Sequence, residues 1–397
     1  MCRRTGPLLP GYLRAATLGW INPNGCGGCR PDGNVPGTSP YPYPWNGEYF
    51  QPCEGGSGYE NYGDTCGGPY WYDIFAEAVV FTRTGTASQV LSSDGIRGFG
   101  PPNVVLSSDS ADFGYEPGFR ITGRHQCNAV YNIEASYLGA LDWQNSASVT
   151  SDINSLYSVF SDFGNTPFGG FEDTDQAQQH SVSVEGELES AEVTFRRSWI
   201  SPNYCVNGSW LLGARWINME DALRFQSLVV AHDDPITPVV NAAERGPAFA
   251  DYRVSVSNDL VGAQLGTSLV GRIIPGIAIG GEVKAGVYAN AGDQTTQLLA
   301  SGLPNDFTES VDDTGVAYAT DGRVYILWQF HPLMKLRAGY EVLYLSGVGS
   351  AASNFNDTVP LAAAIQNTGQ TPTRAPFLDL DDQAIFDGAN VGLEIGW

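Results

Sequence analysis

The sequence contains no run of about eighteen consecutive apolar residues, the length that a membrane-spanning α-helix needs. It also shows no convincing amphipathic helix, because its apolar residues do not recur at helical spacing. Helices are therefore excluded as membrane-crossing elements. Any part of the chain that crosses a membrane must be built from strands in a closed sheet, since an open edge leaves its backbone groups unpaired in lipid.

Basic residues are scarce: 20 Lys and Arg stand against 43 Asp and Glu, and the formal net charge is −23. This balance argues against nucleic acid as a partner, because the phosphate backbone would be repelled. Only 16% of the 397 residues are charged, whereas 48 are Gly and 12% are aromatic. Such a composition favours many strands and turns over helices.

The last eleven residues alternate between large apolar residues and small or polar ones. Val391 and Ile395 fall on one strand face with the terminal Trp397, whereas Glu394 falls on the other. In a closed transmembrane barrel, lipid covers the apolar face, the first strand pairs with the last, and the terminal aromatic lies at the membrane interface. We therefore interpret this ending as the C-terminal assembly signal of a bacterial outer-membrane protein.

Residues 130–143 show the same alternation most clearly. Tyr131 and Trp143 end one face, and Glu134 and Asp142 belong to the other. Twelve residues of a strand tilted by about 40° cover roughly 30 Å along the membrane normal. This length spans an apolar band of about 25 Å and places one aromatic at each rim.

Alternating segments recur from residue 72 to the end of the chain and predict a closed antiparallel transmembrane barrel of ten strands. We expect them near 72–83, 115–124, 129–143, 182–199, 208–230, 250–272, 277–290, 318–331, 334–346 and 387–397. Long acidic connections (84–114, 144–181, 231–249, 291–317 and 347–386) alternate with short ones (125–128, 200–207, 273–276 and 332–333). Because outer-membrane barrels have long extracellular loops and short periplasmic turns, both termini should be periplasmic. If the segments 208–230 and 250–272 each folded back into two strands, the barrel would have twelve strands.

Residues 1–70 form a separate unit in this interpretation, followed by the barrel at 71–397. They are rich in Gly, Pro and Cys and show no strand or helix period, which predicts an irregular periplasmic extension. The basic residues Arg3 and Arg4 near its start could begin a signal peptide, but Gly6 and Pro7 interrupt the apolar core that must follow. We therefore expect the natural start of the protein to lie upstream.

The chain has seven cysteines, an odd number. Cys26 and Cys29 have the spacing of a zinc site, but Cys53 and Cys66 do not complete it, so disulfides are the favoured use. Cys127 and Cys205 fall in two neighbouring short turns and are predicted to form a disulfide with each other.

Several segments resemble β-barrel porin family 7, a bacterial outer-membrane family of largely undefined function. They are Trp71–Ala78, Gly118–Gly123, Ile133–Tyr137, Glu192–Arg197, Leu212–Trp216, Asn258–Gly266, Lys284–Asn290 and Leu336–Tyr340. Each segment is weak alone, and their order from residue 71 to the end carries the resemblance. It implies an outer-membrane barrel in a Gram-negative type of envelope and supplies no catalytic residues.

The strand face opposite the apolar one should line the lumen, and its charged members are nearly balanced. They are Glu77, Glu116, Glu134, Asp142, Glu192, Glu282, Glu341 and Glu394, with Arg120, Arg124, Arg196, Arg215, Lys284, Arg323 and Arg337. An ion-selective pore would show a surplus of one sign, whereas balanced charges predict cross-strand ion pairs. Since the interior of an eight-stranded barrel is already filled by side chains, ten strands leave a narrow or plugged lumen.

Aromatic residues at the strand ends should mark the two membrane interfaces. The candidates are Tyr131, Trp143, Trp216, Trp328, Tyr344 and Trp397. The partners expected from this arrangement are outer-membrane lipid and, through the terminal strand, the barrel assembly machinery. We expect a monomer that contacts no nucleic acid and is able to admit small solutes.

Two weaker patterns concern chemistry. His232, Asp233 and Asp234 loosely resemble the His and Asp groups of outer-membrane aspartyl-type proteases, but a second acidic pair is missing, so we expect no enzyme activity. Acidic stretches at 171–175, 311–314 and 378–382 could bind Ca²⁺ through carboxylates, although none has the twelve-residue calcium-loop pattern. We otherwise expect no cofactor.

The sequence thus predicts a porin-like outer-membrane barrel with a narrow or plugged lumen and restricted passage of small solutes. A structural or surface-adhesion barrel without transport is the main alternative, and an outer-membrane hydrolase is a remote one.

Overall fold

Ten strands form one closed antiparallel barrel. The computed structural model describes residues 72–85, 87–128, 130–200, 206–231, 246–302, 306–331, 333–356 and 377–396. The barrel strands are β1 (Tyr72–Thr84), β4 (Glu116–Gln126), β5 (Tyr131–Thr150), β7 (Gln179–Ile200), β8 (Val206–Val229), β9 (Ala248–Ile274), β10 (Ile277–Ala300), β11 (Phe307–His331), β12 (Met334–Val348) and β13 (Asp382–Gly396). The predicted extension at 1–70 lies outside the described residues.

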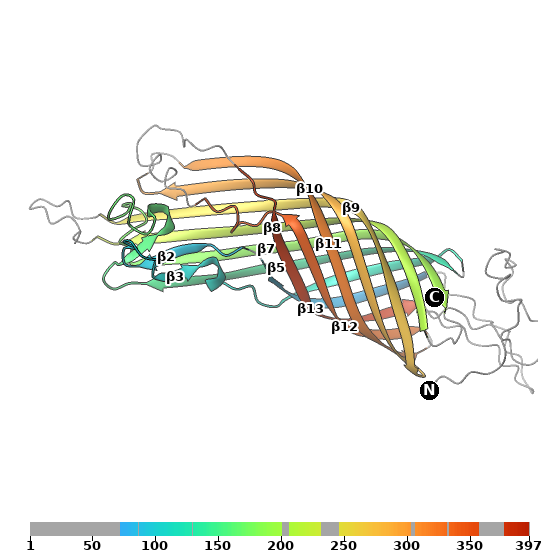
Figure 1. Cartoon of the computed structure of the whole chain (residues 1–397). Coiled ribbons are helices and arrows are strands. Elements are labelled where there is room, and N and C mark those ends of the chain that lie inside the picture. Colours follow the sequence, from blue (N-terminus) through green and yellow to red (C-terminus); the bar gives the residue numbers. More distant parts are fainter. Residues whose placement is uncertain are drawn as a thin grey trace, which may run out of the picture.

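The barrel closes between its first and last strands. β1 pairs with β13 from Asp73, opposite Gly396, to Thr84, opposite Ile385, and its other edge pairs with β4. All other neighbours follow chain order (Figure 1). The predicted pairing of the first strand with the last is confirmed, and so is the number of ten strands, because β8 and β9 run without folding back.

The strands alternate between an apolar outer face and an inner face as their sequence predicts. On β8, Trp210 and Leu212 are 61% and 63% exposed, whereas Leu211 between them is 4% exposed. On β13, Val391 is 48% exposed and Glu394 2%. A soluble protein would bury side chains of this size, so the outer face is suited to lipid.

A β-bulge in β5 reverses part of one prediction. Ala140 adopts a left-handed backbone conformation (φ 59°), and the pairing of β5 with β7 shifts register between Leu138 and Leu141. Because a one-residue shift moves every following side chain to the other face, Trp143 points into the lumen and Asp142 points outward. The prediction of Trp143 as an interface aromatic and of Asp142 as a lumen acid is therefore wrong.

Six neighbouring strands extend well past the other four at the end that carries the long connections, here called the loop end. Figure 1 shows these long strands, β5 and β7 to β11, continuing beyond β12 and β13. The opposite end, which carries the short connections, is called the turn end. The long acidic loop predicted at 291–317 is mostly strand, since β10 ends at Ala300 and β11 begins at Phe307.

Two of the long connections fold into a cap at the loop end, defined here as residues 87–115 and 151–178. The cap contains a three-stranded sheet of β2 (Val90–Asp94), β3 (Val104–Ser107) and β6 (Leu156–Ser158), together with the 3₁₀ turns η1 (Ser108–Ser110) and η2 (Val159–Ser161). Figure 1 shows β2 and β3 among the ends of the long strands.

The cap packs its apolar residues against the inner wall of the long strands. Phe160 lies against Phe225 on β8, Tyr252 on β9 and Phe355, with ring centroids 5.1 to 5.9 Å apart. These residues belong to a buried apolar cluster that also includes Leu91 and other cap residues. The barrel interior at the loop end is thus a packed core.

No helix in the described part of the chain is long and apolar enough to cross a membrane.

Candidate functional site

A layer of paired charges fills the lumen towards the turn end and is called here the lumen ladder. Its acids are Asp73, Glu77, Glu134, Glu192, Glu282, Asp321, Glu341 and Glu394, and its bases are Arg120, Arg124, Arg196, Arg215, Lys284, Arg323, Lys335 and Arg337. Eight carboxylates therefore face eight cations. Each is paired, and at least one member comes from every barrel strand except β9.

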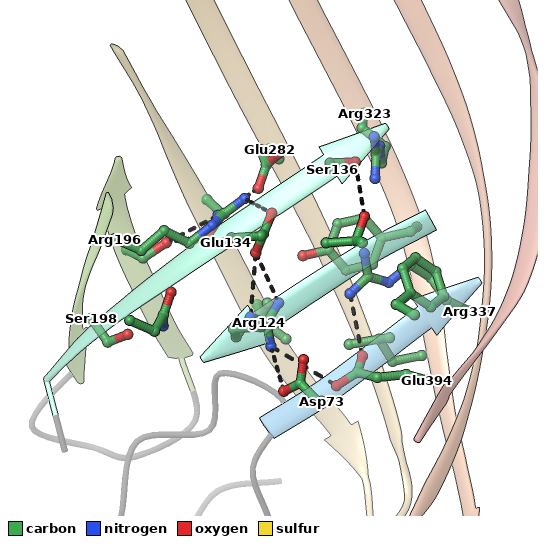
Figure 2. Close-up of a pocket in the computed structure, with 18 of the residues that line it drawn as sticks. Asp73, Arg124, Glu134, Ser136, Arg196, Ser198, Glu282, Arg323, Arg337 and Glu394 are labelled. Carbon is green, nitrogen blue, oxygen red and sulfur yellow. Dashed lines mark hydrogen bonds and ion pairs between the residues drawn. The ribbon is translucent and has the colours of Figure 1, made fainter. Parts of the chain in front are cut away.

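The first part of the ladder crosses the barrel between β1, β4, β5, β7 and β10. Arg124 lies 3.2 Å from carboxylate oxygens of both Asp73 and Glu134. Glu134 also accepts from Arg196 at 3.0 Å, and Arg196 donates to Glu282 at 2.7 Å. Figure 2 shows these side chains reaching across the lumen from their strands. Strand alternation supplies this arrangement, because every member occupies an inward position.

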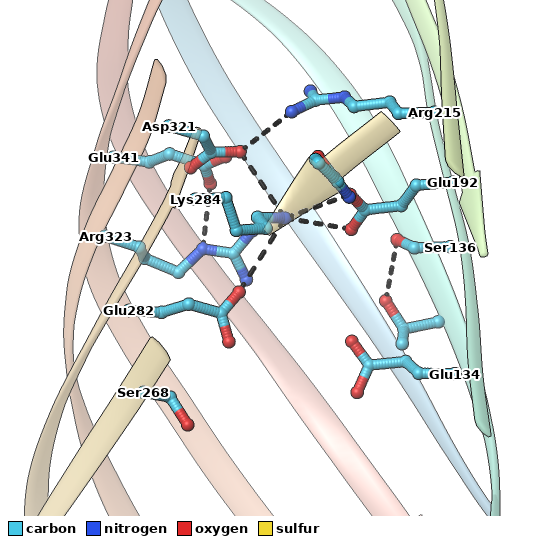
Figure 3. Close-up of polar contacts among 12 residues, drawn as sticks. Glu134, Ser136, Glu192, Arg215, Ser268, Glu282, Lys284, Asp321, Arg323 and Glu341 are labelled. Carbon is cyan, nitrogen blue, oxygen red and sulfur yellow. Dashed lines mark hydrogen bonds and ion pairs between the residues drawn. The ribbon is translucent and has the colours of Figure 1, made fainter. Parts of the chain in front are cut away.

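The second part centres on Lys284. Its ammonium lies 2.9 Å from Glu192, 3.5 Å from Asp321 and 3.7 Å from Glu282, and Asp321 also pairs with Arg215 at 3.2 Å. Figure 3 shows Lys284 surrounded by these three acids. The side chain of Lys284 is only 4% exposed, so the three carboxylates replace the water that its charge has lost.

The third part is a compact group of two arginines and two glutamates. Arg120 makes a two-pronged contact with Glu341, at 2.7 Å for both bonds, and lies 3.3 Å from Glu77. Arg323 approaches the same two carboxylates at 3.1 and 3.6 Å. Bidentate arginine pairs fix orientation as well as charge, so this group holds β1, β4, β11 and β12 in register across the lumen.

Most of the predicted lumen residues lie in this ladder, with two exceptions. Asp142 faces outward because of the bulge, and Glu116 is half-buried at the start of β4, in none of the ladder's ion pairs. Sequence reasoning missed Asp73, Asp321 and Lys335. Strict alternation would have found them, since each stands two or four residues from a predicted member on the same strand.

The ladder leaves a polar cavity of about 60 Å³ between its members and the turn end. Hydroxyl and amide groups of Ser198, Asn207, Ser209 and Ser268 line it together with the charged side chains. A space of this size holds a few water molecules or a very small solute. The equal number of both charges gives no basis for strong selection of cations over anions.

Above the ladder, towards the loop end, the lumen is apolar. Val79, Phe81, Leu141, Trp143 and Phe386 are among the buried residues of this layer. An ion moving through it would lose water without gaining a partner. The interior therefore consists of three levels: the ladder, the apolar layer and the cap.

One ion pair crosses the lumen within the apolar layer. Arg83 on β1 donates to Asp221 on β8 at 2.9 Å, and the side chains are 1% and 8% exposed. The Arg83 guanidinium also lies over the rings of Phe113 and Phe386, 5.1 and 5.9 Å from their centroids. Sequence analysis missed this pair, because neither residue stood among the predicted lumen charges.

The cap meets the barrel wall at a buried polar centre around His180 of β7. Its Nε2 donates to the Thr174 carbonyl at 2.9 Å, which leaves Nδ1 to accept from the Ser92 hydroxyl at 2.7 Å. Asp175 next to it accepts from the backbone N–H groups of Ser158 and Phe171 at 2.6 and 2.7 Å. Burial lowers the pKa of His180 to about 4 and raises the pKa of Asp175.

This Ser92–His180 pair has the residue types of a nucleophile and its base, but both side chains are fully buried. Their bond joins β2 of the cap to β7 of the wall, so the pair fastens the cap to the barrel. The loosely protease-like His232, Asp233 and Asp234 lie outside the described residues. Of the remaining histidines, His125 stacks on Tyr72 near the turn end, where His331 also lies.

On the outer face, aromatic residues contact acids near the limit of the apolar band that lies towards the loop end. The Trp216 indole donates to Asp259 at 3.3 Å, and Tyr137 donates to Glu189 at 2.9 Å. Among the predicted interface aromatics, Trp328 is exposed towards the turn end and Tyr131 stacks on an outward phenylalanine, while Tyr344 donates to Gln383. Trp397 lies outside the described residues.

Beyond that limit, a row of carboxylates runs across the extended strands. In the first group, Asp142 lies opposite Glu187, and Glu187 lies opposite Glu220. In the second group, Asp293 lies opposite Asp312. Ser257 on β9 lies between the groups, opposite both Glu220 and Asp293. All five acids are exposed. Like charges directly opposite each other on neighbouring strands repel, so the row is stable only where water surrounds it. Lipid must therefore cover only the apolar band on the turn-end side of this row.

The predicted calcium-binding stretches at 171–175, 311–314 and 378–382 lie within the described residues. In the part of the chain that the structure describes, no three His, Cys, Asp or Glu side chains are arranged to hold a metal ion. Asp175 is instead occupied by protein donors. Cys127 is exposed, and because Cys205 lies outside the described residues, their disulfide stays a prediction.

Comparison with known proteins identifies the family. A family model described as "Putative beta barrel porin-7 (BBP7)" matches residues 175–397, more than half of the chain. No curated protein matches the sequence.

Several solved outer-membrane barrels are similar in fold only. The outer membrane protease OmpT from Escherichia coli has 10% identity and a TM-score of 0.40, with 82% of this chain and 97% of that chain covered. Ail, the attachment invasion locus protein of Yersinia pestis, has 9% identity, a TM-score of 0.22 and coverage of 82% and 99%. A Pseudomonas aeruginosa FadL homologue has 11% identity, a TM-score of 0.24 and coverage of 81% and 88%.

Proposed function

This chain belongs to the β-barrel porin-7 family of outer-membrane proteins, and on that premise we propose that it restricts passage across the membrane to very small polar solutes. The observation that carries the proposal is the lumen ladder, a buried and balanced set of ion pairs around a cavity of about 60 Å³. Such a lumen has a polar path on its turn side and no room for a wide aqueous channel.

The orientation that fits this role places the turn end and both termini in the periplasm. The cap then faces the exterior, as the long loops of such barrels do. The terminal strand, which pairs with β1 and presents Val391 to lipid, would serve as the contact with the assembly machinery. One closed barrel needs no second copy to complete its sheet, which favours a monomer.

A second candidate is a structural barrel that presents its cap and carries nothing. It is favoured by the packed core between cap and wall, where Phe160 contacts Phe225, Tyr252 and Phe355. The Ser92–His180 pair supports no enzymatic role, since both side chains are fully buried.

Conductance in planar bilayers distinguishes the two candidates. Restricted passage predicts brief, small steps for the purified protein, with similar values for cations and anions because the ladder is balanced. Steps as large as those of open porins would contradict the narrow lumen. Complete silence, under conditions where an open porin conducts, would overturn restricted passage and favour the structural barrel.

A further inference from the structure

The segment that follows β12 turns back into the barrel instead of leaving over the rim. This segment, residues 349–356, is called here the strap. Ala351 and Phe355 are 1% and 4% exposed, and Phe355 packs on Phe160 of the cap and on Tyr252 of β9, at 5.6 and 4.9 Å between ring centroids. The strap therefore joins the cap to the barrel wall across the mouth of the lumen.

Asparagine side chains on the inner wall hold the end of β12 and the beginning of the strap. Asn258 on β9 accepts from the Gly349 N–H at 2.7 Å and donates to the Gly349 carbonyl at 2.9 Å. Asn290 on β10 donates to the Gly347 carbonyl at 3.0 Å and to the Asn258 side-chain oxygen at 3.1 Å. Both asparagines are essentially unexposed, so the strap replaces water as the partner of Asn258, and Asn290 supports that contact through the Asn258 side chain.

One carboxylate connects the strap to both sides of the barrel. Asp221 on β8 accepts from Arg83 through one oxygen at 2.9 Å and from the Ala351 N–H through the other at 2.7 Å. β1 and β8 are separated by three strands in one direction around the barrel and five in the other. The strap is thus fastened where an ion pair already spans the lumen.

The strap differs from the rest of the interior in what holds it. The ladder residues belong to the barrel strands themselves, and the cap has its own sheet. The strap forms no strand, and its described polar contacts with the wall run through side chains of the barrel strands, namely Asp221, Tyr252, Asn258, Gln294 and Asp382. Segments held in this way open at lower free energy than strands in a ladder of backbone bonds.

We propose that the strap is a built-in closure of the lumen and that Asp221 is its latch, so that release of the strap from Asp221 opens the mouth of the lumen between the cap and the barrel wall. The expected effect of the latch on conductance rests on the proposed passage of small solutes. The latch itself is a separate physical claim, because it predicts local opening whether or not solutes pass.

Asp221→Asn and Asn258→Ala test the latch, with Glu220→Gln as the matched control. Glu220 is the neighbouring residue on β8 and faces outward. Hydrogen–deuterium exchange is measured on strap amides 349–356 of the full protein in detergent, and conductance is recorded in planar bilayers. Heat-modifiable gel migration verifies that each barrel is folded.

We expect strap amides to exchange about ten-fold faster or more in both test variants, as loss of a hydrogen bond to a buried charged or amide group predicts, and wild-type exchange in Glu220→Gln. Open steps should become more frequent in the same two variants. Unchanged strap exchange in folded Asp221→Asn and Asn258→Ala would overturn the latch, even if the wild type conducts. Faster strap exchange with silent bilayers would support the latch and reject the passage proposal.

Discussion

The Trp143 indole on β5 donates a hydrogen bond to the Phe81 backbone oxygen on β1, 3.1 Å away, although β4 lies between these strands. This contact exists because the bulge at Ala140 shifts the register of the loop-end half of β5 by one residue, so that Trp143 points into the barrel. The ring also lies 5.5 Å from that of Phe386 on β13. A single residue at the bulge thus decides which side chain fills the middle of the lumen.

Replacement of Ala140 by glycine should stabilise the protein by about 1 kcal/mol, because glycine adopts a positive φ without the steric cost that alanine bears. Ala140→Val should destabilise it. The measurement is urea-dependent unfolding in lipid vesicles, followed by tryptophan fluorescence. Ala135→Gly, in the regular part of β5, is the control and should cost about 0.5–1 kcal/mol. Equal losses in Ala140→Gly and Ala135→Gly would show that the bulge has a different backbone.

Lys284→Met should lower the free energy of unfolding by about 3–5 kcal/mol, because it leaves buried Glu192, Glu282 and Asp321 without their shared cation. Arg253→Met is the matched control. Arg253 pairs with Glu185, but the two side chains are 44% and 43% exposed, so its loss should cost about 1 kcal/mol or less. Urea titration in vesicles compares both with wild type. A loss at Lys284 no greater than that at Arg253 would mean that the ladder is open to water.

Acidification should loosen the cap through His180. Its folded-state pKa of about 4 lies below the ordinary value of 6.5, so the unfolded chain takes up the proton first as the pH falls. The stabilisation is complete above pH 6.5 and declines towards pH 4, by about 3 kcal/mol in total.

The check is the unfolding free energy at pH 7.5 and pH 4.5 for wild type and His180→Gln. Asp175, whose pKa burial raises, contributes the opposite trend but is present in both proteins. The difference between the two pH profiles therefore isolates His180. Parallel profiles would contradict a buried neutral imidazole.

A charge on the outer face should be costly only within the lipid band. Leu265 on β9 is 66% exposed and belongs to that band, so Leu265→Arg should destabilise the vesicle-inserted protein by about 2–4 kcal/mol. Ser255 lies on the same strand and face beyond the carboxylate row, and Ser255→Arg should change stability by less than about 0.5 kcal/mol. The same loss at both positions would place the membrane boundary nearer the loop end.

The period of two allowed much of the barrel and its lumen to be predicted from sequence. Glu77, Arg120 and Glu341 could be assigned inward positions because each stands in a strand whose other face is apolar. Their mutual contact could not be predicted, since it joins β1, β4 and β12 through the register of a closed sheet. Only three-dimensional closure brings these side chains together.

Two other features gave too little signal for prediction. The bulge requires a left-handed backbone conformation at position 140. A glycine there would have indicated this conformation in the sequence, whereas an alanine does not. The cap strands β2, β3 and β6 have three to five residues each, too few to show a period, and they form a sheet of their own inside the barrel wall. Asp221 was unrecognised because its role depends on the strap.

The unequal strand lengths give the barrel an oblique rim. β12 ends at Val348 and β1 at Thr84, whereas β8 and β9 continue for many residues beyond the apolar band. The wall is therefore high on one side and low on the other, so that, under the proposed passage of small solutes, a solute would leave sideways from under the cap, over β12, β13, β1 and β4. In the proposed orientation, the low side of the rim opens parallel to the cell surface. Solutes would then enter and leave the barrel in the direction of the membrane plane.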